Sequence, residues 1–459
     1  LCSTTLGTQR TLTVGTLTAA YADFRDIVIA GAAAGTTPTG AGNCGNNSGI
    51  TFSPAPTTLY WNLAGTQNFS ASGWATSSGG VPNSTNFPRA QDTIVFDNAG
   101  AISAFTAETQ WNIGTVDAST RTVAMTYAHG TVAPPIYYGG WVTGTGFSIS
   151  GTSGVTFAGR GTYSLGSANT FIGAVAINNA QTMQLVGNIA SLNGSLSVTC
   201  TQFDANAYNL TFPSMSVQPT ILNMGSGTWT ATGTGSVFTF GTGRTVNKQT
   251  ANLVLDNTST TSRTFLGSNQ RFNKLTIGGP SGTTGTSTLT ISGGNSFTEI
   301  ASTKTVAHTI TFPTSPTLIG AWTATGSVGN LLTIQSAGGA SSPAALVYTS
   351  AGGLSGVNYL LPTNMRGYPL TGAWYIGSNS TRLAELGFFY SSLPAIYNVS
   401  VSESARALDS IAGATITIWN SAVTNTVQAS QTNSAAPVYR SSIADTVQAS
   451  QTNAAKEVF

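Results

Sequence analysis

Short apolar triplets recur along the middle of the chain, and most of them have threonine at the centre. They begin at Leu253, Leu275, Leu289, Ile310 and Leu332, with a further triplet at Leu210. Because side chains at positions i and i+2 of a strand share a face, each triplet directs two apolar residues inward and its middle residue outward. Most of these starts are separated by about 21 or 22 residues, which fits one coil of a β-helix with short strands. The shorter interval from Leu275 to Leu289 indicates either a shortened coil or a second strand of one coil, and Leu210 lies near twice the period before Leu253.

A longer repeat supports the same interpretation. Residues 227–233 read Gly-Thr-Trp-Thr-Ala-Thr-Gly and residues 320–326 read Gly-Ala-Trp-Thr-Ala-Thr-Gly. Each copy is preceded by Thr-Phe-Pro, at 211–213 and 311–313, and followed by another apolar triplet. A β-sandwich also has closely spaced strands, roughly every 8 to 12 residues, but it gives no reason to repeat the tryptophan segment. We therefore predict an all-β fold built on a β-solenoid, or β-helix.

The composition of the chain changes along its length and predicts four regions. They are N-terminal β strands with a Gly-rich loop (1–57), an aromatic-rich β region (58–135), the β-solenoid (136–395) and a short tandem-repeat tail (396–459). In the first region, strands are expected around residues 12–17 and 27–29. The open ends of a solenoid must be capped, and residues 58–97 and the tail lie where caps are needed.

The tail consists of a short repeat. Residues 426–433 recur identically at 446–453, and residues 402–409 resemble a diverged earlier copy. A single copy has too few large apolar residues to bury a core. The tail is therefore expected to be either a flexible tether or a segment that folds against partner chains.

Composition narrows the classes of function. Only 7% of the residues are charged, against about 25% in a typical soluble domain, so hydroxyl and amide groups must keep the surface hydrated. The 40% hydrophobic content is enough to drive folding and argues against disorder. The net charge of +2 comes from scattered residues, so we expect no nucleic-acid partner. No run of eighteen apolar residues occurs, so we expect no membrane span. The chain begins at Leu1 with strand-like sequence, which indicates a processed product or part of a longer polypeptide.

Cysteine and histidine residues suggest no cofactor or metal. Cys2, Cys44 and Cys200 lack the spacing of metal ligands. A disulfide between Cys2 and Cys44 is one alternative, and buried unpaired thiols are the other and the favoured one. His129 and His308 lie far from any cysteine or acidic cluster, and His308 is expected on the surface of a coil.

Acidic residues are the candidates for a polysaccharide-cleaving pair, which requires two carboxylates roughly 5 to 10 Å apart. Asp92 and Asp97 bracket a strand, while Asp23 and Asp26 lie in a turn between strands, and such turn positions favour Asp without any catalysis. Acids that would have to converge across stacked coils are Asp204, Asp256 and Glu299. We predict that the chain is not an enzyme and assign no catalytic residue.

Aromatic residues are the remaining candidates for binding. Trp61, Trp74, Trp141, Trp374 and Tyr375 would stack on sugar rings if they were exposed. The alternative is that they cap or fill the β core, and this is the interpretation we favour.

Two segments and the tail carry a resemblance. The first runs from Tyr-Trp-Asn at 60–62 through Trp74 and residues 77–82 to Asp-Thr-Ile-Val-Phe-Asp at 92–97. The second joins residues 357–360 to Ala-Trp-Tyr-Ile-Gly-Ser-Asn-Ser at 373–380 and to Gly387-Phe388. Together with residues 401–410, they resemble stretches of the Gly/Thr/Ser-rich β-helical structural proteins of tailed bacteriophages. The match departs from the usual pattern at Ile376, where Ala is commoner, and at Phe388-Phe389, where the ending usually contains Trp.

This resemblance implies a non-enzymatic virion structural protein, of the fibre, spike or capsid-decoration type, at the virion surface. The partners it implies are other virion proteins, further copies of the chain in a trimer, and host-surface glycan. Two alternatives stay open. One is a glycan-binding adhesin or bacterial surface protein, and the other is a polysaccharide-cleaving tailspike.

Overall fold

The computed structural model describes residues 1–389 except 6, 131–133, 179–180, 351–356 and 371–373, together with the tail strands given below. The chain divides into two compact units, Leu1–Phe388 and Phe389–Phe459. In the described residues the regular elements are strands and three short 3-10 turns, η1 (Gly31–Ala33), η2 (Gly282–Thr284) and η3 (Gly339–Ser341). No helix among them is long and apolar enough to cross a membrane.

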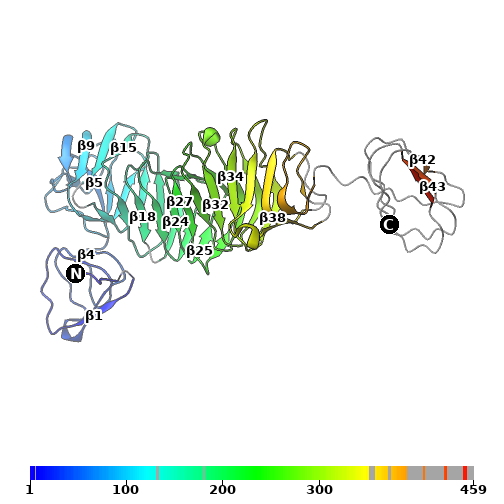
Figure 1. Ribbon diagram of the computed structural model, residues 1–459. Coiled ribbons are helices and arrows are strands. Elements are labelled where there is room, and N and C mark those ends of the chain that lie inside the picture. The colour runs from blue at the N-terminus through cyan, green and yellow to red at the C-terminus, as the bar shows by residue number, and fades with distance from the viewer. Residues whose placement is uncertain are drawn as a thin grey trace. The chain divides into compact units, whose positions relative to one another are not determined.

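The first unit is a stack of parallel β coils (Figure 1). One sheet contains β5 (Thr58–Trp61), β7 (Trp74–Ala75), β8 (Thr93–Val95), β11 (Thr115–Ala118), β14 (Trp141–Thr143), β17 (Tyr163–Ser167), β19 (Thr182–Leu185), β22 (Gln202–Asp204), β25 (Ile221–Asn223) and β28 (Thr245–Asn247). A second contains β6 (Gly65–Asn68), β9 (Ile102–Ala107), β12 (Met125–His129) and β15 (Phe147–Ser150).

The third and largest sheet runs through most of the stack. Its strands up to the middle of the chain are β10 (Asn112–Ile113), β13 (Ile136–Tyr137), β16 (Val155–Phe157), β18 (Val175–Asn178), β20 (Ile189–Ala190), β21 (Leu196–Thr199), β23 (Leu210–Phe212), β24 (Met215–Val217), β26 (Thr228–Ala231), β27 (Gly235–Phe240) and β29 (Asn252–Leu255). The others are β30 (Arg263–Leu266), β31 (Arg271–Ile277), β32 (Thr288–Ser292), β33 (Ser296–Ser302), β34 (His308–Phe312), β35 (Thr317–Trp322), β36 (Leu332–Ser336), β37 (Ala344–Tyr348), β38 (Leu360–Tyr368) and β40 (Leu383–Leu386).

Strand register confirms the coil period. Trp229 is the partner of Leu253, Leu253 of Leu275, Leu275 of Ile300, and Ile300 of Trp322. Each step advances the chain by one coil, so the two tryptophans of the sequence repeat occupy the same column four coils apart. The register also decides between the two explanations of the short interval from Leu275 to Leu289. Leu275 lies in β31, whereas that triplet lies in β32, a second strand of the same coil that pairs with β30 and β34.

The Thr-Phe-Pro part of the repeat behaves differently. Phe212 ends β23, whose strand continues the column into β26 and Trp229. Phe312 ends β34, which pairs with β32 and β36 instead. The two phenylalanines therefore belong to different columns, and the repeat is structurally equivalent only from the tryptophan segment onward.

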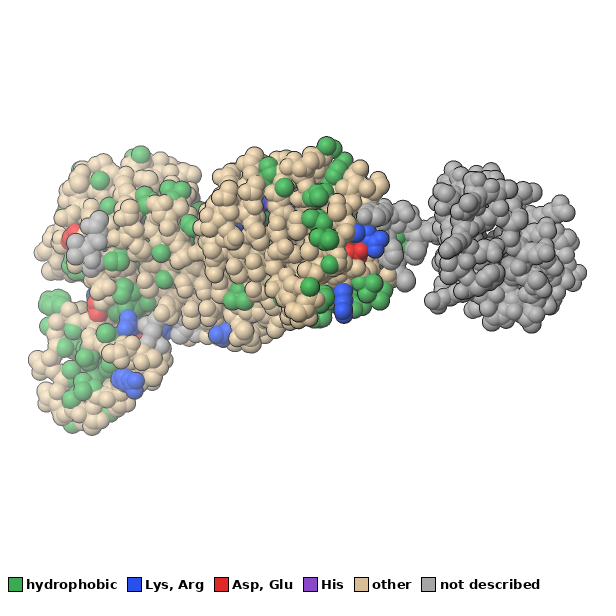
Figure 2. Space-filling view, viewed as in Figure 1, with side chains coloured by type: hydrophobic (Ala, Val, Ile, Leu, Met, Phe, Trp, Pro, Cys, Tyr) green, Lys and Arg blue, Asp and Glu red, His purple; other side chains and the backbone are tan. Residues whose placement is uncertain are grey.

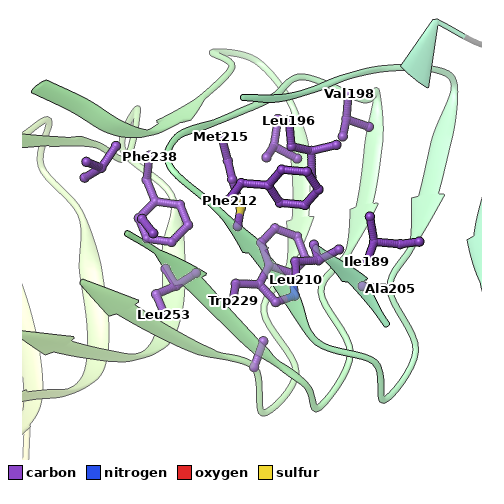
Figure 3. Packing of buried hydrophobic residues seen from close by; sticks show 14 of the residues in the cluster. Ile189, Leu196, Val198, Ala205, Leu210, Phe212, Met215, Trp229, Phe238 and Leu253 are labelled. Carbon is purple, nitrogen blue, oxygen red and sulfur yellow. The ribbon is translucent and has the colours of Figure 1, made fainter. Parts of the chain in front are cut away.

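A single hydrophobic core runs through this stack, from Leu59 to Phe388. Inward side chains of successive coils lie on top of one another, as Figure 3 shows for Leu210, Trp229 and Leu253. Burying each such side chain contributes roughly 1.5 to 3 kcal/mol. Among strand pairs of described register in this unit, only β5 and β7 are antiparallel. The sandwich alternative is therefore excluded, because its layers would be antiparallel throughout.

The aromatic-rich region belongs to the same stack. Thr58 of β5 pairs with Thr93 of β8, and Thr93 pairs with Thr115 of β11, in the same sheet as the later coils. The boundary expected near residue 135 has no counterpart in this pairing. Aromatic and aliphatic side chains both point inward from the same strand positions, so a change in side-chain type leaves the path of the chain unchanged.

The N-terminal region forms a small stack of its own. The expected strand pair is present, as β1 (Arg10–Thr13) lies parallel to β3 (Ile27–Ala30). The Gly-rich segment adds β4 (Gly42–Asn43), which pairs with β2 (Asp23–Phe24). These coils have a separate core of Phe24, Ile27, Ile29, Ala33 and Ala41. We call residues 1–52 the N-terminal module.

In the second unit, three strands are described. They are β42 (Ala407–Leu408), β43 (Gln428–Gln431) and β44 (Gln448–Gln451), in one parallel sheet. Ala429 pairs with Ala449, its counterpart in the next repeat, so identical residues of successive repeats stack in register. The repeats of the tail thus pair with one another in the same manner as solenoid coils. The rest of the predicted tail lies outside the described residues.

Candidate functional site

The tryptophans proposed for glycan stacking are buried. Trp61, Trp74, Trp141 and Trp374 are each at most 1% exposed. Trp61 packs edge to face against Trp74, with ring centroids 4.8 Å apart. Tyr375, in β39 (Trp374–Tyr375), is half-buried. In this structure the four buried rings offer no open face to a sugar. They fill the core, which agrees with the favoured interpretation that they pack inside the β fold.

The cysteines follow the favoured alternative of unpaired thiols, whereas His308 does not lie where it was expected. All three cysteines are free, with Cys2 exposed and Cys44 buried, so the disulfide alternative is not realised.

His308 is only 4% exposed, and the expectation of a surface position is wrong. It begins β34, and its ring contacts the Ser302 hydroxyl at 2.9 Å and the Val306 carbonyl at 2.8 Å. Burial lowers the pKa of His308 to about 4, and it does the same for His129.

The candidate acids of the later coils have separate partners. Asp204 accepts hydrogen bonds from Gln202, Asp256 from the Ser281 amide, and Glu299 from Thr323. None of these contacts joins one carboxylate to another. Among the described residues, no group of three or more His, Cys, Asp or Glu side chains is placed to hold a metal ion.

Asp92 and Asp97 occupy the turn positions predicted for them on either side of β8. Asp92 accepts from Thr57 and from Arg89, and Asp97 from the Ala99 amide. These bonds fix the chain where the strand begins and ends.

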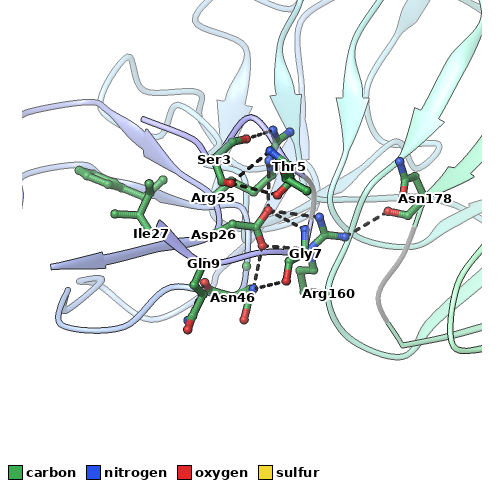
Figure 4. A network of polar contacts seen from close by, with 12 residues as sticks. Ser3, Thr5, Gly7, Gln9, Arg25, Asp26, Ile27, Asn46, Arg160 and Asn178 are labelled. Carbon is green, nitrogen blue, oxygen red and sulfur yellow. Dashed lines mark hydrogen bonds and ion pairs between the residues drawn. The ribbon is translucent and has the colours of Figure 1, made fainter. Parts of the chain in front are cut away.

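The most elaborate polar site in the described residues surrounds Asp26 (Figure 4). Asp26 is fully buried and has a positive φ of 57°. Its carboxylate accepts hydrogen bonds from the Gly7 amide at 3.0 Å and from Asn46 Nδ2 at 2.8 Å. It also forms ion pairs with Arg160 at 3.4 Å and Arg25 at 3.6 Å. Burial alone would raise the pKa of Asp26, but the hydrogen bonds from Asn46, Arg160 and Gly7, with the charge of Arg160, lower it.

This site joins the N-terminal module to the solenoid. Arg160 lies in the loop between β16 and β17 and also donates to the Asn178 carbonyl at 3.1 Å. Arg25 Nη1 donates to the Tyr138 hydroxyl at 3.2 Å, and Asn112 Nδ2 donates to the Asp23 carboxylate at 2.6 Å. A small apolar contact adds to these bonds and consists of Cys44, Ala90, Tyr138 and Ala158. We call this set of contacts the Asp26 joint.

The sequence predicts a turn at Asp26 but gives no sign of its partners. Arg160 is 134 residues away in the chain. An isolated Arg in a Gly-rich loop carries no signal of pairing, so only the three-dimensional arrangement reveals the joint.

A second buried arginine has a purely local role. Arg121 is fully buried, and its guanidinium donates to the carbonyl oxygens of Asp97, Gly100, Ile102 and Val123. These carbonyls belong to the turn of its own coil and to that of the preceding coil. Arg121 thus satisfies backbone acceptors that the coil turns would otherwise leave unpaired.

No family model, curated protein or solved structure matches this chain. The structure itself establishes the fold, which is a β-solenoid.

Proposed function

We propose that the chain is a non-enzymatic structural protein of a tailed-phage virion, in which the solenoid serves as a fibre segment or surface decoration. The single observation that carries this proposal is where the two phage-like segments lie. One begins in the first coil of the stack and the other lies in its last two coils.

The segment at 60–97 supplies β5 and β7 of the first coil, and then β8, which stacks on β5 in the next coil. β7 lies antiparallel to β5 at the edge of its sheet. Because β7 runs opposite to the other strands, a further coil could not continue their parallel pairing on top of it. The parallel stack therefore ends at β7. Trp74 of β7 is buried against Trp61, Phe69 and Phe96.

At the other end, the segment at 357–388 supplies β38 and β39, followed by β40 and β41 (Phe388–Phe389), which pair with them in the next coil. Trp374 packs against Trp322, Tyr348 and Phe388, with ring centroids 5.4 to 6.0 Å apart. Trp374 and Phe388 are completely buried. These rings cover the inward side chains of the final coils.

Aromatic side chains thus close the core at both ends of the stack, while the edge strand β40 keeps Leu383 and Leu386 exposed. Uncapped solenoid ends offer unpaired strands to other molecules and promote uncontrolled association. A capped block can be joined in series with other modules, which suits an assembled fibre. Its surface also suits an extracellular particle, because the face in Figure 2 carries few charged side chains and is dominated by uncharged polar groups and backbone. The proposed partners are other virion proteins, two further copies of the chain, and host-surface glycan.

The test is to find the chain in particles. Purified virions of the phage that encodes it should contain the full chain in many copies by mass spectrometry, and an antibody to the solenoid should label one structure in electron micrographs. Recovery of the chain only in the cell-envelope fraction would contradict the proposal and favour the bacterial surface protein.

Two further measurements test its components. The solution mass should be that of a trimer for the full chain and that of a monomer after residues 396–459 are removed, if the tail holds the copies together. A truncated chain that is still a trimer would mean that the tail has no part in trimer formation. Incubation with host capsular polysaccharide or lipopolysaccharide should release no reducing ends. Sugar released at saturating protein would replace the structural role with that of a cleaving spike.

A further inference from the structure

Three basic side chains lie together inside the later coils. Arg263 begins β30, His308 begins β34, and Lys304 lies in the turn just before it. Their exposed fractions are 1%, 4% and 6%. Because β30 pairs with β32 and β32 pairs with β34, the three side chains span three consecutive coils, with Ser287 just before β32 in the middle one. We call Arg263, Lys304 and His308 the Arg263 cluster.

The guanidinium of Arg263 is only partly satisfied. Its Nη2 donates to the Ser287 hydroxyl at 3.1 Å, but Nε and Nη1 are buried without a hydrogen-bond partner. Arg121, which is equally buried, has carbonyl acceptors for Nε, Nη1 and Nη2. Buried donors without acceptors are rare in folded proteins. The two arginines therefore differ, because only Arg263 keeps two donors of one guanidinium without a protein acceptor.

The positive charge of the cluster forms no ion pair in the described part of the chain. None of the ion pairs in the described part of the chain includes Arg263 or Lys304. Asp256 favours the charge of Arg263 through its field, but its own carboxylate accepts the Ser281 amide at 2.8 Å and is half-buried. Lys304 Nζ donates to the carbonyl oxygens of Gly282 and Gly285, which are neutral.

Charges within the cluster lower the pKa of its members. Burial, followed by the charge of Arg263, lowers the pKa of Lys304 to about 8. Burial likewise lowers the pKa of His308, with smaller contributions from Lys304 and Arg263, so the imidazole is neutral at pH 7. The cluster therefore holds up to two positive charges in a region that solvent hardly reaches.

We propose that the Arg263 cluster binds one small inorganic anion, in contact with the unpaired donors of Arg263. A water molecule would satisfy a donor but add no counter-charge to the field of Asp256, and buried charge without a paired counter-charge is costly. An anion provides both an acceptor and a counter-charge. It serves the fold as an internal bond between three coils.

The loop beside the cluster, at 278–287, packs closely on the backbone at Asn257. A Cβ at Gly282 would approach the Asn257 amide nitrogen to 2.5 Å, and one at Gly285 would approach the Asn257 carbonyl oxygen to 2.8 Å. This packing holds in place the carbonyl oxygens of Gly282 and Gly285 that accept from Lys304.

The direct test is crystallography of the full chain in sodium bromide. Anomalous diffraction at the bromine edge should show a peak in contact with Arg263 Nε or Nη1. Ordinary water density there without an anomalous signal would overturn the proposal.

A solution test guards against binding at crystal concentration only. At constant ionic strength, replacing sodium gluconate by sodium chloride should raise the thermal unfolding midpoint of the wild type in a saturable manner. Arg263→Met should abolish this rise, whereas Lys274→Met, which removes a surface cation, should keep it. A bromide peak in the crystal with no chloride dependence in solution counts against the proposal. If Arg263→Met does not fold, the wild-type titration and the Lys274→Met control still decide it.

Discussion

The Asp26 joint and the Arg263 cluster are two buried ionic regions of one unit, and they are balanced in opposite ways. At the joint, one carboxylate accepts bonds from Gly7, Asn46 and Arg160 and faces a second arginine. At the cluster, two cations and a neutral histidine have neutral acceptors, and two donors of Arg263 are unpaired. Burial is nearly complete in both. The comparison shows that buried charge can either connect two parts of a solenoid or present donors suited to a counter-ion.

The largest expected effect is at the joint. Asp26→Ala leaves Arg160 and Arg25 without their counter-charge, and breaking a buried pair in this way costs about 3 to 5 kcal/mol. Hydrogen exchange should therefore accelerate in β1 and β3, while the coils after β18 keep their protection. Asp117→Ala, which removes a half-buried acid bonded to Ser119, is the matched control and should change little. Equal protection of β1 in both variants would mean that the joint does not hold the module.

Acid should weaken the solenoid before it weakens the joint. His129 and His308 have a folded pKa of about 4 against 6.5 for the ordinary group. A lowered histidine pKa means that the unfolded chain binds protons first, so stability is complete above pH 6.5 and falls as the pH drops from 6.5 to 4. The loss is on the order of 3 kcal/mol per histidine. Asp26 has a pKa below its ordinary 3.8, so the stability it contributes is lost only below about that pH.

His129→Phe separates these contributions. His129 lies among Tyr127, Trp141 and Phe171, and its Nε2 has no partner. A phenyl ring should fit there and reduce the decline in unfolding midpoint between pH 6.5 and 4 by about half. An unchanged pH profile would contradict the assignment of that decline to buried histidine.

The two buried arginines should respond differently to the same substitution. Arg121→Met leaves several turn carbonyls without a donor and should destabilise the early coils by about 3 kcal/mol. Arg263→Met removes a charge that lacks a described counter-ion, and in chloride-free buffer it should change stability by less than about 1 kcal/mol. Thermal unfolding of both variants in gluconate measures the difference. Equal losses would show that Arg263 is as well satisfied as Arg121.

The smallest effect is expected at a surface ion pair. Lys274 and Glu299 lie on neighbouring coils with a 3.0 Å contact and side chains 34% and 25% exposed. Such pairs contribute about 0 to 1 kcal/mol. Lys274→Ala should therefore shift the unfolding midpoint little, and less still in high salt. A loss comparable to that of Asp26→Ala would mean that burial is not what distinguishes the joint.

Much of the solenoid is predictable from the sequence because its signal is local. Alternation within Leu210–Phe212 and its recurrence at Leu253 and Leu275 reflect which side chains face inward in each coil, and the register confirms them. The two tryptophan segments likewise occupy equivalent positions, because Trp229 and Trp322 face inward in the same column of coils. The Thr-Phe-Pro repeat does not, because turns of different length place the same tripeptide on different strands.

The candidate sites are much less predictable. The sequence singles out Trp61 and Trp374 as aromatics of interest, but it leaves their burial open. It also predicts His308 at the surface, since a histidine before a strand gives no sign of the loop that covers it.

What the sequence by itself determined is the repeating inward face, the coil period and the all-β character, because these depend on residues a few positions apart or one coil apart. Only the tertiary structure decided that the aromatic region is part of the stack, that Asp26 meets Arg160, and that Arg263 lies unsatisfied beside Lys304. These contacts depend on how long each turn is and on how the coils stack. Differences in turn length from coil to coil add up over the stack. The alternation of apolar and polar positions gives no information about them.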